Sequence, residues 1–319
     1  MIRESDSLKN SLNHAQHLHF FQDNSKKLHI LDLKKALSLD EFSWKEINLN
    51  INFKIPIWHR SIMTQQGTIY LTGGSDLESE YKTNLKDVYV YAPFENILKP
   101  LAGLNYARNS HGICILQDFM YVIGGCSEQG GYTASCERFA VNKHYEKAVG
   151  EWQIVASLNQ PANSPCVVNF NDDYIYKFGG VLNLSTMNNT VERYDPKLNV
   201  WTEINYQVFG NKYSSLSLLA ASASVQINRN EILIFGGHDL NRKSNQCCIC
   251  RVDGEDLTIT NQSDKVMPYI GTFWTHPVLI GRKIFCAQNL QLGSSDIVCF
   301  NRKRLLCLDG DKWEEILSE

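Results

Sequence analysis

A short β-prone run that ends in two glycines recurs along the chain and limits what it can fold into. The clear copies are TIYLTGG (68–74), FMYVIGG (119–125), YIYKFGG (174–180) and EILIFGG (231–237). Their last glycines are 51, 55 and 57 residues apart. The same spacing locates two copies without the glycine pair, HLHFFQD (17–23) and KIFCAQN (283–289). A repeat of this length predicts six similar supersecondary units covering nearly the whole chain.

Each repeat also holds further β-prone segments. An apolar run precedes the glycine segment, as in SHGICIL (110–116), and a run with an aromatic residue follows it, as in TVERYD (190–195). A tryptophan comes next in several copies, at Trp44, Trp152, Trp201 and Trp313. No stretch shows a sustained 3.6-residue period, so few helices are expected. Four short strands per repeat predict an all-β chain.

These features resemble the kelch repeat, whose signature is an apolar run, a glycine pair, a tyrosine and then a tryptophan about six residues later. The best copy reads YKFGG (176–180), Tyr194 and Trp201. The resemblance implies a six-bladed β-propeller of four-stranded blades, because sheets packed face to face around an axis bury both of their faces. We expect a single domain, 1–319, with blades at about 12–50, 57–104, 108–158, 162–206, 216–262 and 270–317.

The first blade is expected to have second, third and fourth strands near 17–23, 28–33 and 43–49. Its innermost strand should precede residue 14, where the sequence SDSLKNSLN (5–13) is polar. Three alternatives remain open: residues 5–12 form a poor inner strand, the blade has three strands, or the chain is a fragment of a longer protein.

Composition narrows the function. The net charge is −3 and hydrophobic residues make up 43% of the chain, which is typical of a globular domain without the basic excess of nucleic-acid binders. No apolar run is long enough for membrane insertion, and the N-terminus lacks the apolar core of a signal peptide. We therefore expect a cytoplasmic protein, with cytoskeletal association as one option, whose ten cysteines are free thiols.

In the kelch family, the loops between second and third strands share one face with the loops between blades. Large side chains in these loops are the candidate partner-binding residues, because Tyr, Trp and Arg dominate binding hot spots. They are Trp58, Arg60, Tyr106, Arg108, Tyr132, Tyr213, Arg242 and Trp274. For Arg60 and Arg108 a structural role between blades is at least as good an interpretation. Tyr132 and Arg242 lie in the middle of their loops, which favours binding.

Three other clusters favour ordinary structural roles. His14, His17 and His19 form H-x-x-H-x-H, but no further ligand is apparent nearby. The CCIC sequence at 247–250 is interpreted as a strand that contributes to the core, and Arg302, Lys303 and Arg304 as a solvated turn. No catalytic or phosphate-binding motif is present, so no metal ion or cofactor is predicted.

The leading hypothesis is a non-catalytic interaction scaffold or assembly subunit that binds a protein partner, as a peptide or a folded surface, and that can belong to a larger complex. The chain has no room for a BTB or F-box module, so ligase recruitment is not expected from it alone. The alternative is a small-molecule enzyme of the sugar isomerase or mutarotase type at the mouth of the central channel. His111 and His276, which begin innermost strands, are its candidate residues.

Overall fold

The computed structural model describes most of the chain. The described residues are 17–39, 42–76, 83–128, 130–141, 150–209, 219–241, 244–262, 267, 276–280, 283–291, 300–309 and 312–318; from residue 288 onward only the backbone is described.

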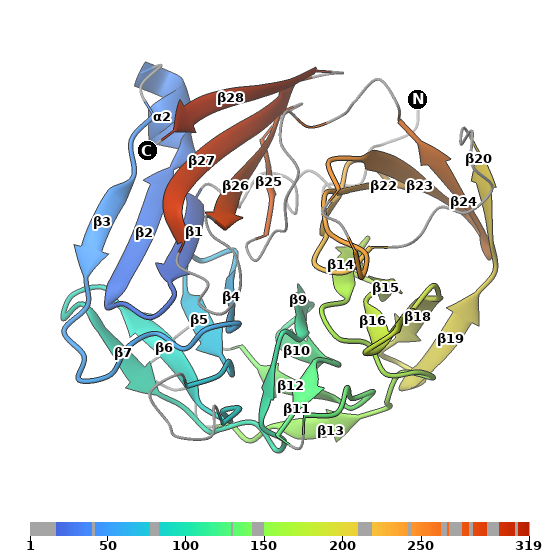
Figure 1. Cartoon of the computed structure of the whole chain (residues 1–319), viewed down its shortest axis with the longest axis horizontal. Helices are drawn as coiled ribbons and strands as arrows, with labels where there is room; N and C mark the ends of the chain where they lie inside the picture. Colours follow the sequence, from blue (N-terminus) through green and yellow to red (C-terminus); the bar gives the residue numbers. More distant parts are fainter. Residues whose placement is uncertain are drawn as a thin grey trace.

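Among the described residues, six sheets of three or more strands stand around a central axis (Figure 1). From the axis outward, the first four are β1–β2–β3 (His17–Gln22, Lys27–Asp32, Lys45–Asn48), β4–β5–β6–β7 (Arg60–Met63, Ile69–Thr72, Val88–Ala92, Ile97–Pro100), β9–β10–β12–β13 (Gly112–Leu116, Phe119–Ile123, Cys136–Ala140, Gln153–Val155) and β14–β15–β18–β19 (Cys166–Phe170, Tyr174–Phe178, Val191–Asp195, Val200–Ile204). The last two are β21–β22–β23–β24 (Ala223–Gln226, Glu231–Phe235, Cys247–Asp253, Asp256–Asn261) and β25–β26–β27–β28 (Val278–Ile280, Lys283–Gln291, Phe300–Asp309, Lys312–Ser318). The predicted six-bladed all-β propeller is confirmed.

Three features depart from six equal four-stranded blades. The first sheet has three strands among the described residues, and the short helix α2 (Leu33–Leu39) lies between β2 and β3. The fifth sheet gains an outer strand, β20 (Tyr206–Phe209), which pairs with β24 in parallel. β20 covers an edge that would otherwise leave backbone groups unpaired. The predicted blade limits run through residues outside the described ranges and stay predictions.

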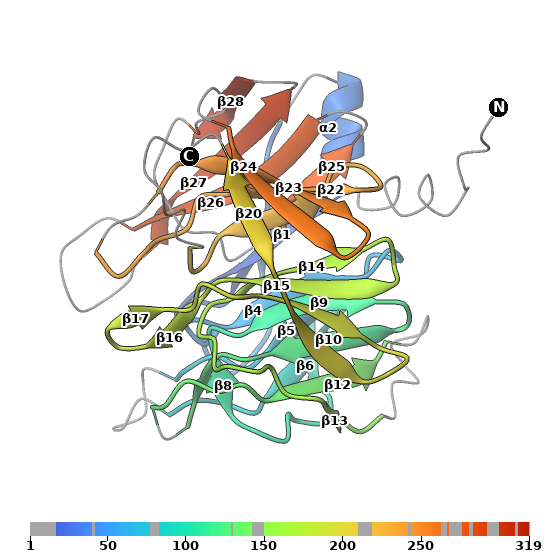
Figure 2. The same cartoon turned by 90° about the vertical axis from the view of Figure 1, so that its right-hand side faces the viewer.

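The two faces of the ring are built from different connections. The loop face carries the connections between second and third strands and those between blades. It includes a two-stranded sheet, β8–β11 (Arg108–Asn109, Cys126–Ser127), and a small hairpin, β16–β17 (Val181–Asn183, Thr186–Met187). The turn face carries the turns between first and second strands and between third and fourth strands. Seen from the side, β16–β17 projects on the left and α2 lies at the right (Figure 2).

Aromatic side chains fill the space between neighbouring blades, as predicted. The Trp152 ring lies 5.3 Å from that of Phe139, and the Trp201 ring 5.1 Å from that of Tyr194. Each indole also donates a hydrogen bond to the preceding blade: Trp152 Nε1 to the Ala102 carbonyl at 2.9 Å, and Trp201 Nε1 to that of Ala156 at 3.0 Å. The repeated tryptophan therefore joins blades as well as filling the core.

The glycine pair is required because two backbones approach it. In the third blade, Gly124 and Gly125 have φ of +63° and +104°. A Cβ on Gly124 would collide with the Ala162 carbonyl oxygen, on the segment leading into the next blade. A Cβ on Gly125 would collide with the Asn109 carbonyl oxygen of its own blade. Any side chain at either position would separate these segments.

We predict that Gly180→Val destabilises the protein by roughly 1–3 kcal/mol, the usual range for a strained backbone position. Gly180 has φ of +100°, and a Cβ there would lie 2.9 Å from the Asn163 carbonyl oxygen. The control is Gly254→Val, whose φ is +66° but whose Cβ would meet nothing within 4 Å. Urea unfolding measures both; equal losses would show that close approach contributes nothing.

Candidate functional site

The loop face is tied together by a chain of backbone hydrogen bonds around the axis. Trp58, Ser110, Ser164 and Ala221 occupy equivalent places before successive inner strands, and all have φ between +50° and +54°. The Ser110 amide donates to the Trp58 carbonyl at 2.9 Å, the Ser164 amide to the Ser110 carbonyl at 2.8 Å, and the Ala221 amide to the Ser164 carbonyl at 2.8 Å. A left-handed backbone conformation is unfavourable for residues other than glycine, and these hydrogen bonds stabilise it here. The residue types at these four positions do not predict this conformation.

The predicted binding residues divide into exposed, buried and undescribed groups. The Tyr106 side chain is half-exposed, and those of Trp58 and Tyr132 are partly buried on the loop face. Tyr213, Arg242 and Trp274 lie outside the described residues.

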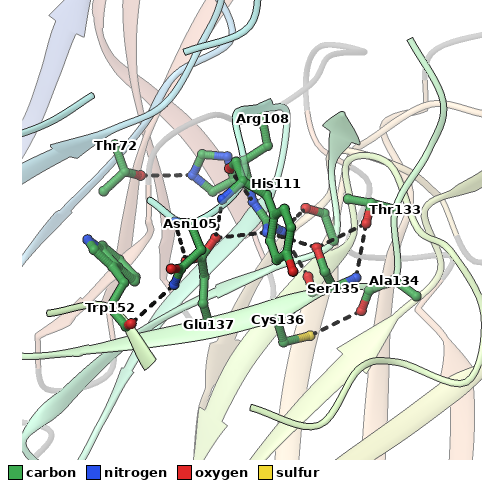
Figure 3. A network of polar contacts seen from close by, with 12 residues as sticks. Thr72, Asn105, Arg108, His111, Thr133, Ala134, Ser135, Cys136, Glu137 and Trp152 are labelled. Carbon is green, nitrogen blue, oxygen red and sulfur yellow. Dashed lines mark hydrogen bonds and ion pairs between the residues drawn. The ribbon is translucent and has the colours of Figure 1, made fainter. Parts of the chain in front are cut away.

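Arg108 is a structural residue, which corrects its assignment as a contact residue. It is fully buried, and its guanidinium donates to the Gly124 and Ser135 carbonyls, both at 2.8 Å, and to Glu137 Oε1 at 2.9 Å (Figure 3). Burial lowers its pKa, while the Glu137 carboxylate raises it. A guanidinium with no exposed surface cannot reach a partner.

Glu137 extends this network to the preceding blade. Its carboxylate accepts hydrogen bonds from the Asn105 backbone amide at 2.8 Å and the Asn105 side chain at 2.9 Å. The fourth blade repeats the contact between glutamate and asparagine, because Glu192 accepts from the Asn159 amide at 2.7 Å. Its cation comes from a different position, since Glu192 pairs at 3.5 Å with buried Lys177 on the second strand. Burial lowers the pKa of Lys177 to about 8, against the opposing effect of Glu192. The repetition at equivalent positions indicates a structural clamp between blades.

Arg60 is also a structural residue and not a partner-binding residue. It is 6% exposed, and its Nε donates to the His111 carbonyl of the next blade at 2.7 Å. Burial lowers its pKa to about 9, although nearby Asp23 acts in the opposite direction. The structural interpretation therefore holds for both arginines.

Two exposed leucines on the loop face were not predicted. Leu184, at the tip of the β16–β17 hairpin, is 89% exposed, and Leu240, in the equivalent loop of the fifth blade, is 41% exposed. The hairpin tip is held by Asn183 Oδ1, which accepts bonds from the amide and hydroxyl of Ser185, both at 3.0 Å. No sequence signal separates a projecting leucine from one that folds back over the core.

The central channel widens toward the turn face. A cavity of about 620 Å³ is bounded by inner-strand residues and by first turns, including Gln66, Gln117, Asp172 and Gln226. Toward the loop face, beside Arg60 and Gly112, the remaining cavity holds about 40 Å³. The wide mouth and the projecting side chains therefore lie on opposite faces.

The candidate residues of the enzyme alternative are separated. His276 lines the wide cavity, but His111 does not; it shares a 2.8 Å hydrogen bond with Thr72 Oγ1 and is fully buried. Desolvation and Arg60 lower the pKa of His276 to about 4. Desolvation, with a contribution from His276, lowers that of His19 to about 3. His19 and His276 are thus neutral at pH 7.

The remaining clusters have the following positions. His17 and His19 lie on β1, and His14 is outside the described residues; among the described residues no group of three or more potential ligands could hold a metal ion. Cys247 and Cys250 of β23 are buried in separate core clusters, as the strand interpretation requires.

Residues 302–304 were predicted as a turn, which is wrong: they lie within β27, paired with β26. No helix in the described part of the chain is long and apolar enough to cross a membrane.

Comparison with known proteins places the chain among kelch-repeat sequences. The kelch motif family model matches residues 162–206. Human (Homo sapiens) Kelch-like protein 23 is 30% identical over 152 residues, which cover 46% of this chain and 24% of that protein. Beta-scruin of Limulus polyphemus is 28% identical over 156 residues, covering 46% of this chain and 16% of its own length. The chain thus matches about a quarter or less of these relatives. The solved structure of YjhT superposes with a TM-score of 0.67 at 12% identity, covering 94% of this chain and 96% of that one.

We predict that Arg108→Met destabilises the protein by about 3–5 kcal/mol, because it leaves the Glu137 carboxylate buried without its cation. The matched control is Arg251→Met, since Arg251 pairs with Glu231 at 2.5 Å but its side chain is 60% exposed; that change should cost about 0–1 kcal/mol. Thermal and urea unfolding measure both. Similar losses in the two variants would argue against the clamp.

Stability should also fall on acidification below pH 6.5. The unfolded chain protonates His19 near its ordinary pKa of 6.5, whereas the folded protein keeps it neutral down to about 3. Stability is therefore complete above pH 6.5 and declines toward pH 3, by roughly 2 kcal/mol at pH 5. His19→Gln should show a shallower decline over this range in urea unfolding. Parallel pH curves for variant and wild type would contradict this assignment.

Proposed function

Because this chain belongs to the kelch-repeat family, we propose that it is a non-catalytic protein-binding module that grips its partner with the loop face. It would act as a scaffold or assembly subunit in the cytoplasm. The eight cysteines whose side chains the structure describes are free thiols, which agrees with a reducing compartment. Cytoskeletal association belongs to the same proposal.

The observation that carries the proposal is the set of apolar side chains that the described part of the loop face projects into solvent. Tyr106, Leu184 and Leu240 are 50%, 89% and 41% exposed, and they come from three different blades. Single exposed apolar side chains are common on protein surfaces, and Phe94 and Leu198 are as exposed on the turn face, so the proposal rests on three such side chains from different blades sharing one face with the connections between blades. The backbone bonds beneath the loops reduce the ordering that binding would require.

The isomerase alternative has less support. The wide cavity opens at the turn face, and its histidines His19 and His276 have pKa values of about 3 and 4. An efficient general base has a pKa near the working pH. The other candidate, His111, does not line that cavity.

We predict that Leu184→Asp abolishes capture of the partner from cell extract without lowering stability, because a charge replaces an apolar contact at the tip of a hairpin that projects from the loop face. Mass spectrometry of the captured proteins, with thermal unfolding alongside, provides the measurement. The control is Leu198→Asp in the same blade: Leu198 is 72% exposed but lies in the β18–β19 turn on the turn face.

The loop-face assignment requires the two variants to differ. Loss of the same proteins with Leu198→Asp alone would move the docking surface to the turn face. Unchanged capture with both variants would remove the leucine from the interface.

A further inference from the structure

The third and fourth blades each hold a buried cation at the same place beneath the loop face. In the third blade it is the guanidinium of Arg108, which donates to the Ser135 hydroxyl at 2.8 Å and to Glu137 Oε1 at 2.9 Å (Figure 3). In the fourth blade it is the ammonium of Lys177, which donates to Thr190 Oγ1 at 2.8 Å. The cation comes from different strands, β8 and β15, but it reaches equivalent partners.

Asp87 occupies the corresponding place in the second blade. In each of these blades the first glycine of the pair donates its backbone N–H to the carbonyl of this residue: Gly73 to Asp87 at 2.9 Å, Gly124 to Ser135 at 3.1 Å and Gly179 to Thr190 at 3.2 Å. The second blade therefore has a carboxylate where the third and fourth blades have a hydroxyl group that is bonded to the cation.

Apolar residues occupy both cation positions in the second blade. Pro56 corresponds to Arg108, because each lies two residues before a member of the chain of backbone bonds around the axis. Leu71 corresponds to Lys177, because each lies two residues before the glycine pair. The second blade thus keeps an anionic group at this place and replaces the groups that could neutralise it.

The fifth blade has also replaced the cation, but there the charge is replaced with it. Its two cation positions hold Leu219 and Ile234. Its residue equivalent to Asp87 is the neutral Gln246, whose carbonyl accepts from the Gly236 amide at 3.0 Å. In the described parts of the second to fifth blades, the combination of a carboxylate here with two apolar cation positions is therefore confined to the second.

A cavity of about 180 Å³ lies at this place in the second blade, where the connection from the first blade passes over it on the loop face. Its lining includes Pro56, Asp87 and the aromatic residues Phe53 and Tyr89. Typical small-molecule sites have volumes of roughly 300–1,000 Å³. This cavity is smaller, and it fits the end of one long side chain.

The aromatic residues replace the asparagine and glutamate of the clamp. Phe53 stands at the position of Asn105 and Tyr89 at that of Glu137, and the two rings stack with their centroids 5.0 Å apart. Desolvation and the Asp87 carboxylate raise the pKa of Tyr89 to about 12. An aromatic face attracts a cation, and a guanidinium can stack on it while its N–H groups bind a carboxylate.

The charges around the cavity favour a cation. Asp76 and Lys54 also line it, with opposite charges, so the described lining holds two carboxylates and one ammonium group. The surplus charge is negative and includes the carboxylate beside the aromatic pair.

We propose that this cavity receives an arginine side chain of the protein partner. The guanidinium stacks on the aromatic pair and binds Asp87, and so takes the place that Arg108 fills from within the chain in the third blade. This inference rests on the proposed function, because it names a residue type that a partner on the loop face presents.

Titration of the full chain with N-acetyl-arginine amide, followed by NMR, tests the site without a partner. We expect shifts of the backbone amide signals of Phe53 and Tyr89, and none from N-acetyl-citrulline amide, which has nearly the same shape and no charge. Asp87→Asn should weaken binding at least about fivefold. Asp253→Asn, which removes an exposed carboxylate in the β23–β24 turn, should leave binding unchanged. Equal shifts from the citrulline compound, or equal binding by Asp87→Asn, would overturn the proposal.

A second variant fills the cavity from within. Pro56→Arg places a guanidinium at the position of Arg108, so it should block the arginine compound in a protein that still unfolds cooperatively. Binding as strong as that of the wild type would show that the compound binds elsewhere. If this variant does not fold, the comparison of Asp87→Asn with Asp253→Asn still decides.

The results also separate this inference from the proposed function. Loss of capture by Leu184→Asp without binding of the arginine compound would overturn the cavity assignment alone. Binding of the compound, together with capture that neither Leu184→Asp nor Asp87→Asn reduces, would overturn the docking of a partner on this face.

Discussion

The structure depends on bonds that hold each blade in register with the next. On the loop face these are the backbone bonds that join Trp58, Ser110, Ser164 and Ala221, together with the indole and carboxylate contacts beneath them. On the turn face, the Gln117 amide donates to Asp172 at 2.8 Å, and the side chain of Gln226 to that of Asn171 at 2.7 Å. Because both faces are tied, loops from different blades keep fixed relative positions, which a composite docking surface requires.

The sequence predicts the architecture well because the repeated residues act through general physics. A glycine pair is required where backbones approach within contact distance, and tryptophan is favoured where two sheets leave a large gap. Both signals can be recognised within a single repeat, and they recur at the residue spacing of the blades. β20 carries no such signal, because its strand is defined by the free edge of β24 and not by its own alternation.

The candidate site was less predictable, because exposure is a tertiary property. Arg108 and Tyr106 are two residues apart in one loop, yet one is fully buried and the other half-exposed. The partner of Arg108, Glu137, lies 29 residues further along the chain, so the sequence alone does not reveal the ion pair. Leu184 shows the converse. A leucine is expected to be buried, but Leu184 projects into solvent because it lies in a two-residue turn with no apolar surface beneath it.

The two ends of the channel differ in width. Arg60 begins the inner strand of the second blade, where the next three blades have Gly112, Cys166 and Ala223, and its larger side chain narrows the channel beside the loop face. Under the proposed function, a partner on the loop face would meet a nearly closed floor, and its specificity would come from the projecting loops. The open space lies at the far end, against the only inner wall among the described residues formed by a second strand.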